Sequence, residues 1–362
     1  MSDYYRKIIT FPQNRVWRSY PGGRILDQLA GIDPPADSHF PEDWIGSTTR
    51  AINPGREHLT EGISKAVWSG GTSSLPDLIK NDPEYFLGSS HLQRYGEHPM
   101  VLIKFLDAQI RLHFQCHPTA QFAQQFLRSP SGKAEAYHIL SVRDGISEPY
   151  VYLGFQRPPS RESLRQMIIK QDIAAIESCF DKIPVQAGDT LFIPGGVPHA
   201  IGEGIFMLEI MEPSDLAVRF EFERAGYVLP ESARFMQRSL DFCLDVFDYT
   251  PRSIESVRSE QMFRPRKRRE LAQSSIQYDL IGPSTTPCFS IRKTECHEAL
   301  TKSEDSFYYL IVTEGELAIE TKDETRILKR FDKAFIPAGL KSIQISPTSH
   351  QNTRILEVFP PR

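Results

Sequence analysis

The chain has 362 residues, of which 40% are hydrophobic and 24% are charged, and its formal net charge is −4. This composition is that of a folded globular protein with a mixed surface, which argues against wholesale disorder and against broad attraction to nucleic acid or to an anionic membrane. No run approaches the roughly 18 apolar residues of a membrane span, and the amino-terminal residues lack a signal-type apolar core. We therefore expect a cytoplasmic protein without nucleic-acid or membrane partners; oligomeric state leaves no trace in the sequence.

Short apolar runs separated by turns dominate the chain. The 27 prolines and 22 glycines interrupt these runs in the manner of strands joined by turns. Helical periodicity is limited to residues 75–86, 163–180 and 231–247. The five cysteines are scattered and never form C-x-x-C, which argues against a disulfide framework or a thiolate zinc finger. We predict a mostly β protein with a few inserted or packed helices.

An internal repeat organises the sequence. Residues 188–196, which contain Gly-Asp and Ile-Pro-Gly, recur as residues 331–339, and a strand that ends at Gly145 recurs as one that ends at Gly315. Two copies of one β unit predict two cupin-type jelly-roll barrels. The first copy is longer between its glycine turn and its aspartate, by about the length that the predicted helix at 163–180 requires.

The repeat also predicts the domain boundaries. Residues 1–230 form an amino-terminal metal-binding cupin barrel with a helical insertion near 160–182, and residues 231–285 form a helical and linker segment. Residues 286–362 form a carboxy-terminal, degenerate barrel without metal. The basic run at 264–269 is most simply a solvated surface stretch in a mildly acidic chain, rather than a nucleic-acid patch.

A candidate metal site lies in the first copy. Residues 109–117 alternate between apolar and polar side chains, so Gln115 and His117 point the same way from one predicted strand. Glu135 opens the next predicted strand, and His199 follows a proline-glycine turn. Each side chain alone is an ordinary hydrogen-bonding residue, but together they make a mixed nitrogen and oxygen set that suits zinc and also accepts manganese, cobalt or iron.

The second copy serves as an internal control for this site. In an ungapped alignment of the two copies, His199 falls opposite Ser342 and Glu135 falls opposite Asp305. The second copy keeps the turn residues and loses the imidazole. The scaffold therefore does not require His199, and we expect at most one metal ion per chain.

At these residues the chain resembles the type I phosphomannose isomerases, also called mannose-6-phosphate isomerases, which are zinc enzymes of the cupin superfamily. Its length is similar to that of the short bacterial members. The family motifs are matched by Lys104, Gln115-Cys116-His117-Pro118, Gly132-Lys133-Ala134-Glu135, His199-Ala200-Ile201-Gly202, the Ser214 to Arg219 stretch and the Glu42 to Gly46 tryptophan element.

The resemblance implies an isomerase that interconverts mannose 6-phosphate and fructose 6-phosphate through an enediol(ate). It implies one Zn²⁺ per chain and four zinc ligands, which are Gln115, His117, Glu135 and His199. A small sugar phosphate is the implied partner.

The resemblance also implies roles for residues around the metal. Arg219 would stabilise the developing oxyanion, although it could also be an ordinary salt-bridge residue. Lys133 and Asp215 are rival candidates for proton transfer, with a surface lysine and a turn aspartate as the alternatives. Lys104 is the expected phosphate contact, and Trp44 belongs to the predicted substrate-binding set.

One position departs from the family pattern. Members of this family commonly carry a serine that helps to hold the substrate phosphate, and His113 occupies that place here. We include His113 among the predicted substrate-binding residues. Because of this replacement, two alternatives stay open: an isomerase of an unphosphorylated sugar, and a non-catalytic sugar-binding cupin.

Overall fold

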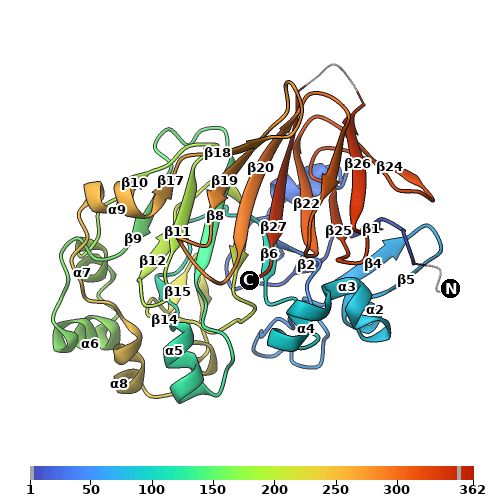
Figure 1. The fold of residues 1–362 in the computed structure, drawn as a ribbon. Coiled ribbons are helices and arrows are strands. Elements are labelled where there is room, and N and C mark those ends of the chain that lie inside the picture. Colours follow the sequence, from blue (N-terminus) through green and yellow to red (C-terminus); the bar gives the residue numbers. More distant parts are fainter. Residues whose placement is uncertain (1–3, 349–351) are drawn as a thin grey trace.

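A computed structural model describes residues 4–348 and 352–362 of the chain. Two β units lie side by side, the first in green and yellow and the second in orange and red (Figure 1). Each unit consists of two antiparallel sheets that enclose a core, and a few short helices cover the outside. The prediction of a mostly β, double jelly-roll protein is confirmed. Within the described residues each sheet is open at both ends, so neither unit is a closed barrel.

The first unit carries the candidate metal site. Its larger sheet has the order β17-β11-β8-β13-β6-β3-β2 and its smaller sheet the order β10-β9-β12-β7-β14. The strands of the larger sheet are β17 (Met262–Phe263), β11 (Thr190–Ile193), β8 (Glu135–Val142), β13 (Ile205–Met211), β6 (Leu102–Asp107), β3 (Glu42–Ile45) and β2 (Arg15–Val16). Those of the smaller sheet are β10 (Ile183–Pro184), β9 (Tyr150–Leu153), β12 (His199–Ile201), β7 (Gln115–Cys116) and β14 (Val218–Arg219).

An apolar core fills most of the space between these two sheets. Alternating residues of the strands, among them Tyr137, Leu153, Leu191 and Met207, are buried there. The metal-site residues lie at one end of this core. A rigid apolar interior therefore supports a polar site.

Helices cover the outer face of the smaller sheet, at the lower left of Figure 1. The predicted helix at 163–180 is two helices, α6 (Arg161–Lys170) and α7 (Ile173–Ser178). The break occurs because Gln171 adopts a left-handed conformation with φ 50° and the Asp172 side chain caps the next helix. The predicted helix at 231–247 is wrong in extent.

Three short pieces occupy that last segment, because the chain turns repeatedly to pack its aromatic residues against the sheet. They are the 3₁₀ turns Glu231–Ala233 and Leu244–Val246 and the helix α8 (Leu240–Cys243). The other helical elements are α1 (Arg24–Leu29), α2 (Leu75–Asn81), α3 (Pro83–Leu87), α4 (Ser89–Tyr95), α5 (Ala120–Phe122), the π-helical turn Ala123–Leu127 and α9 (Ile254–Glu260). Among the described residues, no helix combines the length and apolar character that crossing a bilayer requires.

The second unit also has a large and a small sheet, with the orders β18-β19-β20-β27-β22-β25-β1-β4-β5 and β21-β26-β23-β24. The strands of the large sheet are β18 (Arg266–Glu270), β19 (Ile276–Ile281), β20 (Ser290–Cys296), β27 (Thr353–Phe359), β22 (Tyr308–Glu314), β25 (Lys333–Ile336), β1 (Ile9–Thr10), β4 (Lys65–Trp68) and β5 (Gly71–Ser74). Those of the small sheet are β21 (Leu300–Ser303), β26 (Ser342–Pro347), β23 (Leu317–Glu320) and β24 (Thr325–Leu328). A separate hairpin joins β15 (Glu223–Arg224) to β16 (Tyr227–Val228).

The two units share strands and a core. Strands β1, β4 and β5 come from the amino-terminal part of the chain but complete the sheet of the second unit. Between the units, the ring of Phe331 lies 5.6 Å from that of Phe105 and 5.5 Å from that of Phe206. This apolar interface joins the units into one body.

The basic run forms the exposed edge strand β18. Arg266 and Arg268 pair with Asp279, Lys267 pairs with Glu270, and Arg269 pairs with Glu304. Charged side chains on an edge strand oppose unwanted strand addition.

The strand register corrects two details of the sequence analysis. Ile193 pairs with Glu135 in the first unit and Ile336 pairs with Tyr308 in the second, so the counterpart of Glu135 is Tyr308 and not Asp305. The ungapped count failed because the glycine turns follow strands of different length. The predicted strand at 109–117 is too long, because only Gln115–Cys116 form a strand, β7. Arg111 is buried, which breaks the predicted alternation of buried and polar side chains.

Candidate active site

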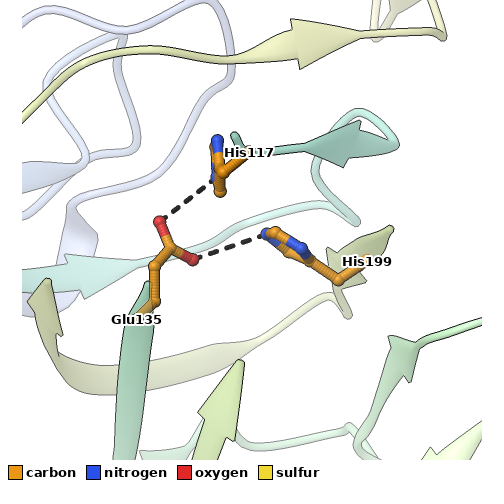
Figure 2. A group of neighbouring side chains, drawn as sticks. All are labelled: His117, Glu135 and His199. Carbon is orange, nitrogen blue, oxygen red and sulfur yellow. Dashed lines mark ion pairs between the residues drawn. The ribbon is translucent and has the colours of Figure 1, made fainter. Parts of the chain in front are cut away.

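Two adjacent strands of the smaller sheet and one strand of the larger sheet bring the candidate ligands together. Gln115 lies in β7 directly opposite His199 of β12, His117 follows β7, and Glu135 is the first residue of β8. Figure 2 shows the Glu135 carboxylate pointing between the two imidazoles. Its Oε1 lies 3.2 Å from His117 Nε2, and its Oε2 lies 3.4 Å from His199 Nε2. All three side chains are buried.

Two glycines permit the loops around these residues to approach one another. A Cβ atom on Gly132 would lie 2.4 Å from the backbone nitrogen of Ala120, and one on Gly195 would lie 2.7 Å from Thr119 Cα. The amide of Gly196 also donates to the carbonyl of His117 at 2.6 Å. Gly132, in the motif that ends at Glu135, and Gly195, in the turn before His199, thus have a steric role beside the site.

Backbone carbonyls orient both imidazoles. Nδ1 of His117 lies 2.8 Å from the carbonyl of Leu216, and Nδ1 of His199 lies 2.9 Å from that of Val197. A carbonyl only accepts hydrogen bonds, so each Nδ1 carries the proton and each Nε2 presents its lone pair to the site. Burial, together with the nearby Lys133 ammonium, lowers the pKa of His117 to about 3, which keeps this ring neutral.

The three side chains have the arrangement of a cation site. Ligand atoms of His117, Glu135 and His199 all lie within 4.8 Å of one another. His117 Nε2 and Glu135 Oε1 are buried and have no hydrogen-bond partner among the described residues. Lone pairs of this kind are costly to bury unless an ion or a hydrogen satisfies them.

Gln115 lies beside this group. Its amide nitrogen is 3.3 Å from His199 Nε2. Rotation of the terminal amide exchanges its nitrogen and oxygen, so the same side chain can present an oxygen there. The fourth predicted ligand is therefore close enough to take part.

Hydrogen bonds fix the approach to Glu135. The Glu212 carboxylate accepts from the amides of Gly132 and Ala134 at 3.1 and 2.9 Å. Lys133 Nζ lies 3.3 Å from Glu135 Oε1, and burial lowers the pKa of Lys133. The Tyr137 hydroxyl donates to Glu135 Oε2 at 2.5 Å.

A small polar cleft opens next to the group, with a cavity volume of about 40 Å³. Three buried ion pairs line it: Arg18 with Asp215 at 3.0 Å, Arg18 with Glu42 at 2.8 Å, and Lys104 with Glu209 at 2.9 Å. The lining residues are Arg18, Ser19, Tyr20, Glu42, Lys104, Leu106, Leu112, His113, Gln115, Lys133, Ile201, Glu209, Asp215 and Arg219.

The three predicted catalytic residues all line this cleft. Arg219 lies in β14 opposite Gln115, and its Nη1 donates to the carbonyl of Ala233 at 2.9 Å. Burial opposes ionisation of Asp215, but the Arg18 guanidinium outweighs burial and holds the pKa of Asp215 well below its usual range. Asp215 is thus a paired carboxylate, whereas Lys133 has a lowered pKa.

Two of the predicted substrate-binding residues line the cleft and one does not. Lys104 is ion-paired within it, and His113 presents its imidazole there. Trp44 is fully buried beneath the charged residues, where its indole nitrogen donates to Glu42 Oε2 at 2.7 Å. The Arg18 guanidinium lies 5.1 Å from the Trp44 ring centroid, so Trp44 supports the lining rather than forming it.

Sequence reasoning missed Glu209, Arg18 and Glu42 as lining residues. Glu209 had a detectable signal, because it is an acidic residue inside the apolar strand β13. Burial, opposed by Lys104 and reinforced by Glu135, raises the pKa of Glu209 to about 7. Arg18 lies in no motif, and only the fold brings it to Asp215.

Comparisons with known proteins agree with this arrangement. No family model matches the chain. Mannose-6-phosphate isomerase of Streptococcus mutans is 31% identical over 232 residues, which are 64% of this chain and 66% of that protein. The crystal structure of mannose 6-phosphate isomerase from Bacillus subtilis superimposes with a TM-score of 0.71 at 18% identity, covering 97% of this chain and 99% of that one.

A further solved structure is that of a mannose 6-phosphate isomerase bound with zinc and yttrium. It superimposes with a TM-score of 0.67 at 18% identity and covers 98% of this chain and 99% of that one.

The two jelly-roll units and the buried His-Glu-His group define a protein of the cupin class with a candidate metal site in its first unit. Within that class, the sequence relationship is decisive. The chain belongs to the mannose-6-phosphate isomerase family.

Proposed function

We propose that this protein is a zinc-dependent aldose-ketose isomerase that interconverts mannose 6-phosphate and fructose 6-phosphate, and that it acts in the cytoplasm. The observation that carries the proposal is the convergence of His117, Glu135 and His199, with ligand atoms within 4.8 Å of one another beside a polar cleft. The family to which the chain belongs supports the same reaction.

The residues present fit a divalent ion. Two imidazole nitrogens and one carboxylate oxygen face one point, and two of these atoms have no hydrogen-bond partner among the described residues. We assign His117, Glu135, His199 and Gln115 as the ligands, a set that suits zinc. When bound, the ion supplies a Lewis acid that stabilises negative charge on the sugar oxygens.

The chain's own residues perform the rest of the reaction. Isomerisation of the opened aldose moves one hydrogen from C2 to C1 and one from the C2 hydroxyl to the C1 oxygen, so no co-reactant is consumed. The Arg219 guanidinium, held by the carbonyl of Ala233 and partly buried in the cleft wall, supplies fixed positive charge for the enediolate oxygens. The buried cleft excludes bulk water, which strengthens this interaction.

Proton transfer requires a group that is uncharged or weakly basic near neutral pH. Glu209 meets this condition because its pKa is raised to about 7, and burial shifts the pKa of Lys133 downward from its usual value. Asp215 is less suited, since its ion pair with Arg18 makes it a weak base. We therefore prefer Lys133 or Glu209 to Asp215 as the base.

The proposal is tested with purified protein, an assay for fructose 6-phosphate and metal analysis. Wild-type protein containing zinc should convert mannose 6-phosphate, lose turnover when a chelator removes the metal, and recover it when zinc is returned. Full turnover by protein shown to be free of metal contradicts the metal mechanism. No turnover by zinc-loaded protein contradicts the proposed reaction.

A further inference from the structure

His113 has an unusual hydrogen-bonding state within the cleft. Its side chain lines the cleft and is only 4% exposed as a residue. Nδ1 lies 3.1 Å from the carbonyl of Glu221, whereas Nε2 is buried without a partner among the described residues. One ring nitrogen is therefore fixed to the backbone and the other is left for a ligand.

The partner of Nδ1 determines what Nε2 can do. A carbonyl oxygen accepts only, so Nδ1 carries the proton, and in the neutral ring Nε2 is an acceptor. The nearby Glu221 carboxylate is itself paired with two arginines, since it accepts from Arg111 at 2.6 and 2.9 Å and from Arg224 at 3.2 Å. His113 thus presents a lone pair to the cleft.

A lone pair is matched by a hydroxyl group and not by a phosphate oxygen. An ionised phosphate offers acceptors only, so its approach to Nε2 would place two lone pairs together. Other side chains of the cleft carry positive charge, namely Arg18, Lys104, Lys133 and Arg219.

The position of His113 is suited to such a contact. It lies two residues from Gln115, which places the two Cα atoms at most ~7 Å apart. Gln115 is part of the metal group, where the first two carbons of the sugar must react. Since His113 and Gln115 line the same cleft, we expect His113 to face the carbons beyond the reacting pair.

We propose that His113 is a specificity-determining residue that accepts a hydrogen bond from a hydroxyl group of the open-chain sugar, beyond C2, and that it does not bind the phosphate. This inference rests on the proposed function. It assigns to a histidine, at the position where the family resemblance leads one to expect a phosphate-binding serine, a different part of the same substrate.

The test is a double-mutant cycle in which the His113 side chain and single hydroxyl groups of the substrate are removed separately and together. The kcat/KM of wild-type and His113→Ala enzymes is measured with mannose 6-phosphate and with its 3-deoxy, 4-deoxy and 5-deoxy analogues. Loss of one hydrogen bond should lower kcat/KM of His113→Ala for the full substrate by about tenfold. One deoxy analogue should lower wild-type kcat/KM by a similar factor and cause no further loss in the variant.

Two more variants guard against a merely structural effect. His113→Gln retains a side-chain acceptor and should recover most of the lost kcat/KM. His138→Ala removes another buried histidine, whose Nδ1 lies 2.9 Å from Thr190 Oγ1 outside the cleft, and should show full hydroxyl dependence like the wild type.

Two results overturn the inference. If the loss of kcat/KM caused by His113→Ala multiplies with the loss caused by every deoxy analogue, then no substrate hydroxyl contacts His113. If the variant instead weakens competitive inhibition by inorganic phosphate tenfold, His113 binds phosphate. Both results leave wild-type turnover intact, whereas absence of any wild-type turnover overturns the proposed function and this inference with it.

Discussion

The interiors of the two units place different chemistry on equivalent strands. In the first unit Lys104 of β6 lies opposite Glu209 of β13, and in the second unit Arg292 of β20 lies opposite Glu357 of β27 at the same register. Lys302 Nζ lies 2.5 Å from Glu357 Oε1 in the second unit. Both units thus have a cationic side chain beside the carboxylate at this register, but the first unit adds the cluster of His117, Glu135 and His199.

The difference shows how one scaffold can keep its buried polar interior with or without a metal. Glu357 also accepts from Gln277 at 2.8 Å and from Thr294 at 2.6 Å, so its charge is compensated entirely by protein groups. In the first unit, His117 Nε2 and Glu135 Oε1 keep unsatisfied lone pairs. Glu357 Oε1 likewise has no hydrogen-bond partner among the described residues, but the Lys302 ammonium lies 2.5 Å from it. A carboxylate gathered with two imidazoles therefore marks the functional unit, and a carboxylate paired with a lysine marks the structural unit.

Substituting alanine at the two aligned positions, His199 and Ser342, should give the largest contrast. His199→Ala should lose bound zinc and turnover, by more than the ~10–100-fold that follows loss of an outer-shell partner. Ser342→Ala, at the exposed aligned position in the second unit, should leave both unchanged. Zinc per chain and kcat/KM are measured, with circular dichroism to verify folding. Retention of zinc by His199→Ala would contradict the ligand assignment.

The next contrast distinguishes the effect of the Arg219 charge on kcat from the effect of the metal. Arg219→Ala should keep its zinc but lose about 10²–10³-fold in kcat, the cost of removing one preorganised group that stabilises an oxyanion. Arg292→Ala in the second unit should keep both zinc and kcat below its unfolding temperature. Normal kcat for Arg219→Ala would show that its role is structural.

The ion pair of the second unit should affect stability and not catalysis. Lys302→Met leaves Glu357 buried without its cation and should lower the free energy of unfolding by about 3–5 kcal/mol. The double variant Lys302→Met/Glu357→Gln should recover part of this loss, and Lys322→Met, at an exposed site, should change little. Urea denaturation measures all three. A loss of zinc in Lys302→Met would mean that the two interiors are coupled.

Acid should weaken the first unit through Glu42. Burial opposes its ionisation, but Arg18 and Lys104 outweigh burial and lower the pKa of Glu42 to about 2. Its stabilisation is therefore complete above the unfolded pKa of about 4.5 and is lost as the pH falls from about 5 toward 2, by about 3 kcal/mol. Glu42→Gln should be less stable than the wild type at pH 7. On acid unfolding, the variant should bind fewer protons than the wild type, by at most about one. An unchanged slope of unfolding free energy against pH would contradict this contribution.

Sequence reasoning succeeded where a short local motif determines the outcome. The alternation around Gln115 and His117 and the glycine motifs before Glu135 and His199 predicted four side chains that the fold brings together. Their closeness is a finding, and their role as ligands is a proposal. Glycine and proline turns likewise predicted the mostly β architecture.

Features that depend on contacts distant in sequence were not predicted. Arg18 pairs with Asp215 across most of the first unit, and no local pattern connects them. The extent of the strand at 109–117 was overestimated because Arg111 is drawn to the buried Glu221. The helix at 163–180 was interrupted by one left-handed residue, Gln171, whose conformation periodicity does not detect.

The sharing of strands between the units imposes an order on biosynthesis. Strand β1 is synthesised long before its partner strand β25, because Ile9 pairs with Phe335. Until that partner is synthesised, the apolar residues between the units, such as Phe105 and Phe206, lack their contacts with Phe331. This surface of the nascent chain therefore stays without its native contacts until Phe331 has been synthesised.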